Sequence, residues 1–264
     1  MNKILRLLTT SAFIIFFTVG CSSKKNDAPQ IDDKPPVELY SDAKLALDSA
    51  RYEDATDILE ALDSRYPFGP YSDQVQIDLI YAYYKRDETA LALANIDRFM
   101  RLNPTHPDLD YLYYLRGLTH MATDQQLFQN LFGIDRYNRD PSPSLQAFKD
   151  FKHLLEFYPE SLYAVDAQLR MVFIKDRLAR YEIAIAEWYM KRDAYIAAIN
   201  RSKLVLNNYP DTASVEDALG IMIKAYDKLG LVEPKENALA VLKLNNSKNR
   251  IVRRSERWTL FNWW

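Results

Sequence analysis

Four prolines divide the middle of the chain into segments that share one pattern of apolar positions. They are Pro67, Pro104, Pro159 and Pro210. An alanine stands twelve positions before each proline, and a large apolar residue stands five positions before it. The residue eight positions before is also apolar, except for Ser202 in the fourth segment. These offsets fall on one face of an α-helix, so each segment is predicted to end in an amphipathic helix. The residues at offsets twelve and five are Ala55, Ala92, Ala147 and Ala198, and Leu62, Phe99, Leu154 and Val205.

The residue before each proline predicts how these helices end. Tyr66, Tyr158 and Tyr209 precede three of the prolines, and Asn103 precedes the other. A proline disfavours the α conformation in the residue before it, so each pair is expected to end a helix and turn the chain. Small or aromatic residues recur 24 and 21 positions before the prolines, where a first helix would pack against the second. Helical hairpins of this kind resemble the tetratricopeptide repeat. The prediction is an all-α, elongated solenoid of about five helical hairpins.

The spacing of the prolines predicts two departures from a regular repeat. The intervals are 37, 55 and 51 residues, against about 34 in a tetratricopeptide repeat. In the third unit, residues 127–132 predict a short additional helix that Gly133 ends, and Ser142 with Pro143 is expected to cap the next helix. Residues 161–191 contain neither Gly nor Pro. Up to about thirty residues there are predicted to form one long helix that joins two halves.

These halves and the tail that follows them are the predicted domains of the body. Residues 38–158 would hold repeats one to three, and residues 159–247 would hold repeats four and five. Residues 248–264 carry five basic side chains, one acidic side chain and three tryptophans. Two interpretations are open for this tail: a segment outside the fold, or an adhesive segment for a partner or an anionic lipid surface.

The amino terminus predicts export and a lipid anchor. Residues 1–20 begin with two basic side chains and continue as a short apolar stretch, which is typical of a signal peptide and too short for a membrane span. Small residues before Cys21, the only cysteine, resemble the lipobox of bacterial lipoproteins, with Thr18 where Leu is usual. Cys21 is therefore the predicted site of lipid attachment. Residues 21–37 are polar and rich in proline, which predicts a flexible tether.

Charge and chemistry argue for recognition rather than catalysis. Removal of residues 1–20 changes the formal net charge from −2 to −4, and a mildly acidic body is a poor nucleic-acid binder. His106, His120 and His153 lack any metal-ligand spacing, and the chain has no phosphate-binding loop and no GxSxG motif. We therefore expect no enzyme activity, no metal and no cofactor. A solenoid offers an extended binding surface instead.

Three stretches carry a resemblance to a known family. They are LDSRYPFGPYSDQVQIDLIYAYYK, RFMRLNPTHPDLDYLYYLRGL and NNYPDTASVEDAL, within a region of about residues 38–245. Behind a lipobox, they resemble the BamD (YfiO/ComL-like) family of outer-membrane assembly lipoproteins. The resemblance implies a scaffold of the β-barrel assembly machine, lipid-anchored at the periplasmic face of the outer membrane. It also implies three kinds of partner: a BamA-like barrel protein with periplasmic domains, other Bam lipoproteins, and unfolded outer-membrane proteins that present C-terminal signals.

The first two repeat junctions are the candidate client-binding site. Tyr66, Phe68 and Tyr71 crowd the first junction, and Arg101 and Asn103 lie at the end of the second. The implied client signals end in an aromatic residue and a carboxylate, which an aromatic shelf beside a cation would match. The alternative is that Tyr66 and Phe68 serve only to pack the hinge.

The fourth repeat is the candidate contact for the BamA-like partner. Arg201 precedes the exceptional Ser202, and Arg192 lies in the preceding turn. An arginine suits an interfacial ion pair because its planar guanidinium binds a carboxylate in bidentate fashion. The alternative is a solvated surface arginine.

Two other functions are weighed against this interpretation. Another cell-envelope adaptor with Tyr-Pro repeats, coordinating peptidoglycan and the outer membrane, would predict a coiled-coil segment, and we find no heptad run in the sequence. An enzyme on a helical frame, such as a lytic transglycosylase, would need a separate catalytic domain, for which the chain is too short.

Overall fold

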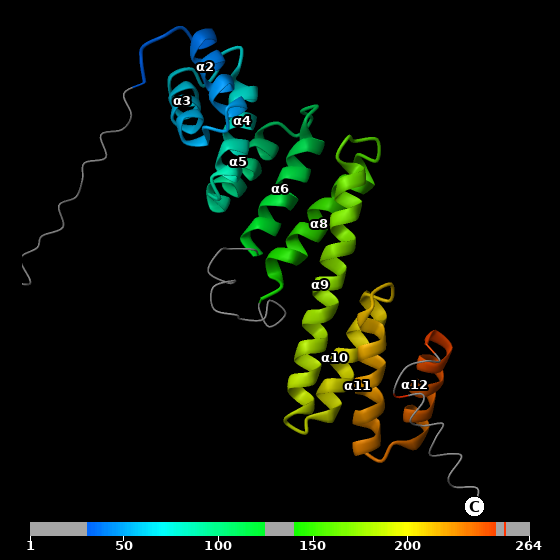
Figure 1. Ribbon diagram of the computed structural model, residues 1–264. Helices are drawn as coiled ribbons and strands as arrows, with labels where there is room; N and C mark the ends of the chain where they lie inside the picture. Colours follow the sequence, from blue (N-terminus) through cyan, green and yellow to red (C-terminus); the bar gives the residue numbers. More distant parts are fainter. Residues whose placement is uncertain (1–30, 125–139, 247–250, 252–264) are drawn as a thin grey trace, which may run out of the picture.

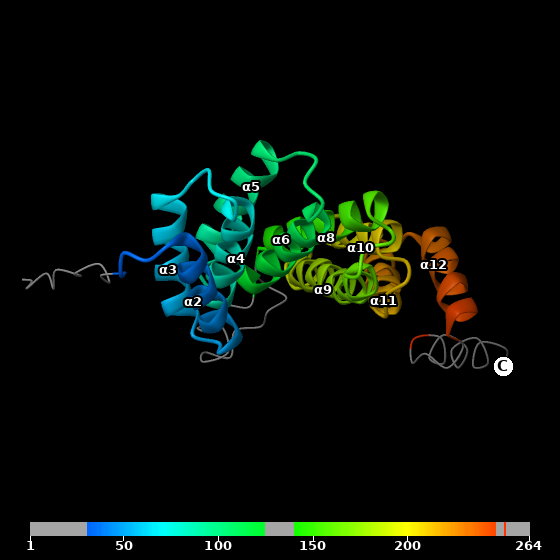
Figure 2. The same cartoon turned by 90° about the horizontal axis from the view of Figure 1, so that it is seen from above.

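The structure, a computed structural model, describes residues 31–124, 140–246 and 251, which form α-helices and no strand (Figure 1). The helices are α2 (Pro36–Asp48), α3 (Tyr52–Arg65), α4 (Ser72–Lys85), α5 (Thr89–Leu102), α6 (Leu109–Asp124), α8 (Ser142–Phe157), α9 (Ala164–Met190), α10 (Tyr195–Asn208), α11 (Ser214–Lys228) and α12 (Val232–Asn245). They follow one another along an elongated molecule, with α2 and α12 near opposite ends (Figures 1 and 2).

Neighbouring helices pair into five hairpins, which confirms the predicted fold class. The pairs are α2–α3, α4–α5, α6–α8, α9–α10 and α11–α12. The connection of the third hairpin contains residues 125–139, so the short helix predicted at 127–132 lies outside the described residues. Helix α8 begins at Ser142 itself, which makes the predicted N-cap wrong by one position. Asp140 Oδ1 accepts hydrogen bonds from the Ser142 amide at 3.0 Å and from its hydroxyl at 2.6 Å, and Pro141 is the N-cap residue.

Four of the hairpins turn in the same way between their two helices. The turn residues Ala50, Asp87, Asp193 and Gly230 all have a positive φ, between 55° and 68°. The amide of the next residue donates a hydrogen bond to the carbonyl five positions back, at 2.9–3.1 Å. This left-handed residue and its closing hydrogen bond are the Schellman ending of a helix.

The turns between hairpins are equally uniform, as the Tyr-Pro pattern predicted. Tyr66, Asn103, Tyr158 and Tyr209 have φ from −126° to −135° and ψ from 48° to 63°. Each amide still donates to the carbonyl four positions back, at 2.8–2.9 Å. Each carbonyl accepts from the amide three positions on, at 3.0–3.2 Å. The residue before proline therefore ends one helix and begins the next turn.

The predicted core positions are buried. The four alanines at offset twelve are fully buried, and the apolar residues at offset five are at most 2% exposed. Alanine at the crossing lets the two helices of a hairpin approach closely. Ser202 is also fully buried, and its hydroxyl has no hydrogen-bond partner among the residues that the structure describes. The exception in the sequence pattern is therefore still a core position.

Helix α9, the first helix of the fourth hairpin, also packs against the third hairpin. Its 27 residues confirm the long helix predicted within 161–191. Its N-terminal half packs against α8 through Ala167, Ile174 and Leu178. Its C-terminal half packs against α10 and α11 through Ala179 and Ile183. The helix is about 40 Å long at the usual rise per residue.

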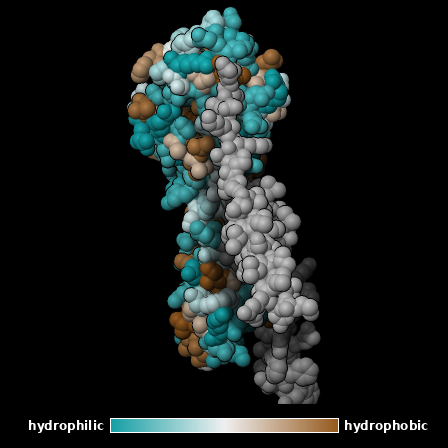
Figure 3. All heavy atoms as spheres, turned by 90° about the vertical axis from the view of Figure 1, so that its left-hand side faces the viewer, coloured by the Kyte–Doolittle hydropathy of each residue, from teal (hydrophilic) through white to brown (hydrophobic). Residues whose placement is uncertain are grey.

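The first helices of the hairpins line one side of the solenoid. Among the principal helix contacts of the described residues, α4 touches α6 and α9 touches α11, whereas no second helix touches another second helix. The first helices are therefore on the inside of the curve, which is where helical-repeat proteins bind extended ligands. Seen from the side of the N-terminal hairpins, the surface is mainly hydrophilic with separate apolar spots (Figure 3).

Candidate functional site

The first junction places its three aromatic residues in different environments. Tyr66 is half-buried and packs against the core of the first two hairpins. Tyr71 stacks on Tyr40 of α2, with ring centroids 5.1 Å apart and planes 17° apart. Phe68, at the tip of the loop, is 98% exposed. The junction thus combines a structural tyrosine, a stacked pair and one aromatic side chain that nothing in the described residues covers.

The second junction lies next to the first. His106 Nε2 lies 3.9 Å from Asp73 Oδ2 at the start of α4, and the His106 ring meets Phe99 edge-on. Asn103 ends α5, and its side-chain amide donates to the Phe99 carbonyl at 3.3 Å, so it serves the turn itself. Arg101 is exposed in the last turn of α5. Nothing in the described residues brings Arg101 into contact with the aromatic residues of the first junction.

A row of tyrosines connects the first helices, and sequence reasoning missed it. We call Tyr40, Tyr111, Tyr114 and Tyr163 the tyrosine row. Tyr40 donates its hydroxyl to Asp78 Oδ2 at 3.0 Å, which joins α2 to α4. The Tyr111 and Tyr114 rings lie 5.4 and 4.7 Å from the Tyr163 ring, which joins α6 to the start of α9. The row has members on α2, on α6 and at the start of α9. The signal in the sequence was the tyrosines of the first helices, which were interpreted as packing residues of the repeat.

The hydroxyls of this row are neutral at physiological pH, and burial raises the pKa of each further. Burial raises the pKa of Tyr111 well above its ordinary value, with smaller contributions from Tyr163 and Tyr81. Burial likewise raises the pKa of Tyr40, and the Asp78 carboxylate adds to it. Neutral phenols both donate and accept hydrogen bonds, and their rings offer apolar surface. Such a row can contact both the backbone and the side chains of an extended peptide.

Two charged side chains, Asp166 and Arg170, lie beside the tyrosine row. Tyr114 donates to Asp166 Oδ2 at 2.6 Å, and Arg170 pairs with the same carboxylate. Burial alone would raise the pKa of Asp166, but the hydrogen bonds from Tyr114 and Arg170 outweigh it and hold the pKa below its ordinary value. Asp166 is therefore ionised at neutral pH and orients the Tyr114 hydroxyl.

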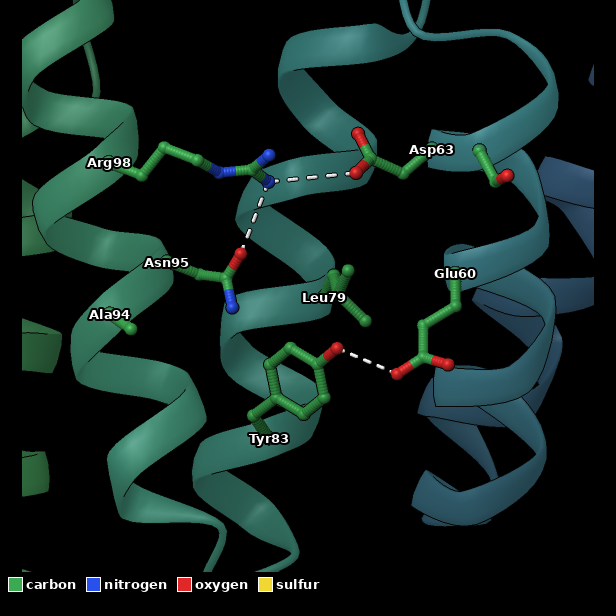
Figure 4. Close-up of a pocket in the computed structure, with 8 residues that line it drawn as sticks. Glu60, Asp63, Leu79, Tyr83, Ala94, Asn95 and Arg98 are labelled. Atoms are coloured by element: carbon green, nitrogen blue, oxygen red, sulfur yellow. Dashed lines mark hydrogen bonds and ion pairs between the residues drawn. The ribbon is translucent and has the colours of Figure 1, made fainter.

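An open hollow of roughly 420 Å³ lies between α3, α4 and α5 (Figure 4). Its polar groups already satisfy one another. Tyr83 donates to Glu60 Oε1 at 2.7 Å, and Arg98 lies 3.6 Å from Asp63 Oδ2. Two carboxylates face a single arginine there, so this hollow does not suit a ligand carboxylate, and we assign it to the packing of the first two hairpins.

The fourth hairpin gives each of the two predicted partner-contact arginines a partner of its own. The Arg192 guanidinium lies 3.7 Å from the centre of the Trp188 ring, and Trp188 meets Tyr189 edge-on. Arg201 Nη1 lies 3.0 Å from Glu182 Oε2, and this pairing raises the pKa of Arg201, with a smaller contribution from Tyr189. Trp188 is 48% exposed. Sequence reasoning missed this tryptophan, although it stands in the last turn of α9, four residues before Arg192.

The remaining chemical predictions concern the anchor and possible cofactors. Cys21 lies outside the described residues. Within residues 31–124 and 140–246, no three His, Cys, Asp or Glu side chains come together as metal ligands. No described helix combines the length and the apolar character that crossing a membrane requires.

The fold and these surfaces define a helical-repeat binding scaffold, with exposed aromatic and basic side chains on an elongated frame. The chain belongs to the YfiO family of outer membrane lipoproteins, whose family model matches residues 32–242.

Three relatives illustrate this membership. The chain is 53% identical to the outer membrane protein assembly factor BamD of Vibrio cholerae over 226 residues, which cover 86% of this chain and 92% of that protein. It is 39% identical to the protein of the same name from Neisseria meningitidis serogroup B over 265 residues, covering 100% and 98%. It is 37% identical to the one from Haemophilus influenzae over 246 residues, covering 93% and 91%. These names describe assembly and no catalysed reaction.

Proposed function

We propose that this protein is a non-enzymatic scaffold that assists the assembly of outer-membrane proteins as part of a Bam complex. The observation that carries the proposal is the family match over residues 32–242, which reaches from before α2 into α12. All five hairpins are therefore those of a family whose relatives are named outer membrane protein assembly factors.

Depletion of the protein from cells tests this function. The amounts of folded barrel proteins in the outer membrane should fall, while peptidoglycan cross-linking and its attachment to the membrane remain unchanged. The reverse result would favour the adaptor that coordinates peptidoglycan and the outer membrane, and would overturn the proposal.

The scaffold is held at the periplasmic face of the outer membrane by acyl chains on Cys21. One acyl chain binds a membrane only marginally, whereas two or more anchor stably. Cys21→Ala should move the protein from the outer-membrane fraction to the soluble fraction in high salt, and Ser23→Ala is the matched control. Membrane retention of Cys21→Ala after removal of its partners would refute the anchor.

Client segments bind along the first three hairpins. The exposed Phe68 ring and the Tyr71–Tyr40 stack supply apolar surface, the tyrosine row supplies neutral hydroxyls, and Arg101 attracts the terminal carboxylate. Tyr66 and Asn103 shape the junctions and act through them. A labelled peptide with a C-terminal aromatic residue should lose affinity for Phe68→Ala and for Arg101→Glu. Unchanged affinity for both variants would remove this site from the proposal.

The fourth hairpin binds the periplasmic domains of a BamA-like barrel protein. Through that partner it also recruits the other Bam lipoproteins. Exposed Trp188 with Arg192 stacked on it is the combination that dominates binding energy in many interfaces. Trp188→Ala and Arg192→Glu should each reduce co-purification of the partner. Lys152→Glu, at an exposed position of α8, is the control charge change. Full partner recovery with both α9–α10 variants would contradict the assignment.

A further inference from the structure

Helix α9 carries a seven-residue apolar repeat that our sequence analysis did not find. Its positions are Val165, Leu169, Val172, Ala179, Ile183 and Ala186, with Asp176 as the one polar member. In the C-terminal half of the helix, Ala179, Ile183 and Ala186 are buried beneath α10 and α11. The N-terminal half continues the same face beyond these helices, as Figure 1 shows for the upper part of α9.

This continuation is exposed. We call its members the α9 stripe: Leu162, Val165, Leu169, Val172 and Phe173. They are 93%, 73%, 66%, 62% and 54% exposed. Single exposed apolar side chains are ordinary, but four along one helix with Leu162 in the turn before it make a patch that soluble monomers rarely leave open. A solvated stripe of this kind requires a cover.

Ile251, the last residue that the structure describes, lies in the fifth hairpin, which packs beside the C-terminal half of α9. Ile251 packs in the apolar cluster between α11 and α12. A Cβ atom on Gly220 of α11 would lie only 2.9 Å from Ile251 Cδ1, so the glycine provides room for this contact. Thirteen residues follow Ile251, and they include three of the four tryptophans of the chain.

The distances allow these residues to reach the whole stripe. Lys175 Nζ bonds to Asp211 Oδ2 at 2.8 Å, so the start of the fifth hairpin lies beside the middle of α9. Gly220 lies nine residues beyond Asp211, or about 14 Å along a helix. Leu162 lies thirteen residues before Lys175, or about 20 Å in the other direction. An extended chain of thirteen residues spans about 43 Å, which exceeds both distances together.

We propose that the C-terminal segment 252–264 docks on the α9 stripe through its aromatic end. The part from Trp258 to Trp264 contains five large apolar side chains, and its extended length of about 20 Å matches the roughly 17 Å of the stripe. A second copy of the chain is the competing occupant, and disulfide trapping distinguishes it from the tail.

Disulfide trapping in intact cells tests the docking in the full chain. Leu169→Cys combined with Phe261→Cys should form an intramolecular disulfide several-fold more efficiently than Leu244→Cys with Phe261→Cys. Leu244 of α12 is the matched control, because it is 88% exposed and lies shortly before the tail in the sequence. An undocked tail would therefore reach Leu244 at least as well as Leu169. Equal or absent trapping of both pairs would overturn the proposal. A disulfide-linked dimer of Leu169→Cys alone would also overturn it, in favour of a second copy.

Proteolysis gives an independent readout without new cysteines. Arg253, Arg254 and Arg257 are trypsin sites within the tail. Leu169→Asp should speed tail cleavage several-fold and leave cleavage of the hairpins unchanged, whereas Leu244→Asp should not. Equal cleavage rates in the wild type and in Leu169→Asp would refute docking. This test does not depend on client or partner binding, so its failure would leave the proposed function intact.

Discussion

Arg201 Nη1 of α10 lies 3.0 Å from Glu182 Oε2 of α9, so an arginine expected to contact a partner is already paired within its own hairpin. Its side chain is 36% exposed and that of Glu182 is 15% exposed. The pair is accessible from outside, yet it also connects the two helices. A charge reversal at Arg201 therefore changes two properties at once, and a single variant cannot separate them.

Exchanging the two charges separates folding from binding. Arg201→Glu places two carboxylates side by side and should lower the free energy of unfolding by about 1 kcal/mol. Adding Glu182→Arg should restore most of that loss, because it re-forms the pair in reverse. Urea denaturation of the single and double variants measures both effects. If the double variant is stable and still recovers its partner fully, Arg201 is not part of the partner contact.

The hairpin turns predict opposite effects for two glycine exchanges. Ala50 has a φ of 55°, which costs about 1 kcal/mol for a residue with a Cβ atom. Ala50→Gly should therefore raise the free energy of unfolding by up to about 1 kcal/mol. Gly230→Ala should lower it by a similar amount, since no atom lies within 4 Å of the added Cβ and only the backbone conformation resists. Thermal melts of both variants check this, and changes of the same sign would contradict it.

The first junction predicts that stability and client binding depend on different aromatic residues. Tyr66→Ala should destabilise the protein by about 2 kcal/mol, because its half-buried ring packs on the core of the first two hairpins. Phe68→Ala should leave the melting temperature unchanged, since that ring is 98% exposed. Calorimetry of the two variants is the measurement. A large destabilisation by Phe68→Ala would mean that the residue packs within the fold and is unavailable to a client.

Ser202 offers a stabilising substitution. Its hydroxyl is fully buried and lacks a hydrogen-bond partner in the described part of the chain, so it was desolvated without compensation. Ser202→Ala removes the hydroxyl and should raise the free energy of unfolding by about 1 kcal/mol. Thr119→Ser is the contrasting variant, because the Thr119 hydroxyl donates to the Leu115 carbonyl at 2.7 Å and serine retains that bond. A destabilised Ser202→Ala would show that the hydroxyl has a partner in solution.

Asp150 of α8 pairs with two side chains of α6, and its removal should be costly. The carboxylate accepts bonds from Arg116 at 2.7 and 2.8 Å and lies 2.7 Å from His120 Nδ1. Asp150→Ala leaves Arg116 with only Asp97 as a charged partner, and a half-satisfied buried pair typically costs about 3–5 kcal/mol. Denaturation in urea should show this loss, with Lys152→Ala on the exposed side of α8 as the control. A loss under 1 kcal/mol would mean that water satisfies these groups.

The repeat pattern predicted the fold because it follows from local rules. Alanine at a helix crossing, an apolar residue seven positions later and proline at the end specify one hairpin without reference to the rest of the chain. Tyr66, Asn103, Tyr158 and Tyr209 then adopt one backbone geometry, since each precedes a proline. The N-cap expected at Ser142 failed for a local reason as well, because the Ser142 hydroxyl donates to Asp140 Oδ1 and the helix already begins at Ser142.

The candidate surfaces were harder to predict, because they depend on contacts between repeats. The Tyr40–Asp78 and Tyr114–Asp166 bonds span 38 and 52 residues, so no short motif records them. Arg201 and Glu182 are 19 residues apart on neighbouring helices. The exposure of the α9 stripe follows from where α10 and α11 end, and a heptad in the sequence does not reveal which of its members a neighbour covers.

One uninterrupted helix, α9, packs against both the third and the last two hairpins. The two halves of the solenoid are therefore mechanically coupled through it. A proline turn joins each pair of successive hairpins, including the turn at Tyr158 before α9, but α9 itself packs against both α8 and the α10–α11 pair as a rod of about 40 Å. A tilt of about 10° at one end of such a rod displaces the other end by roughly 7 Å. A displacement of the first three hairpins therefore moves the last two hairpins as well. A proline placed in the middle of α9 would kink the helix and weaken this coupling.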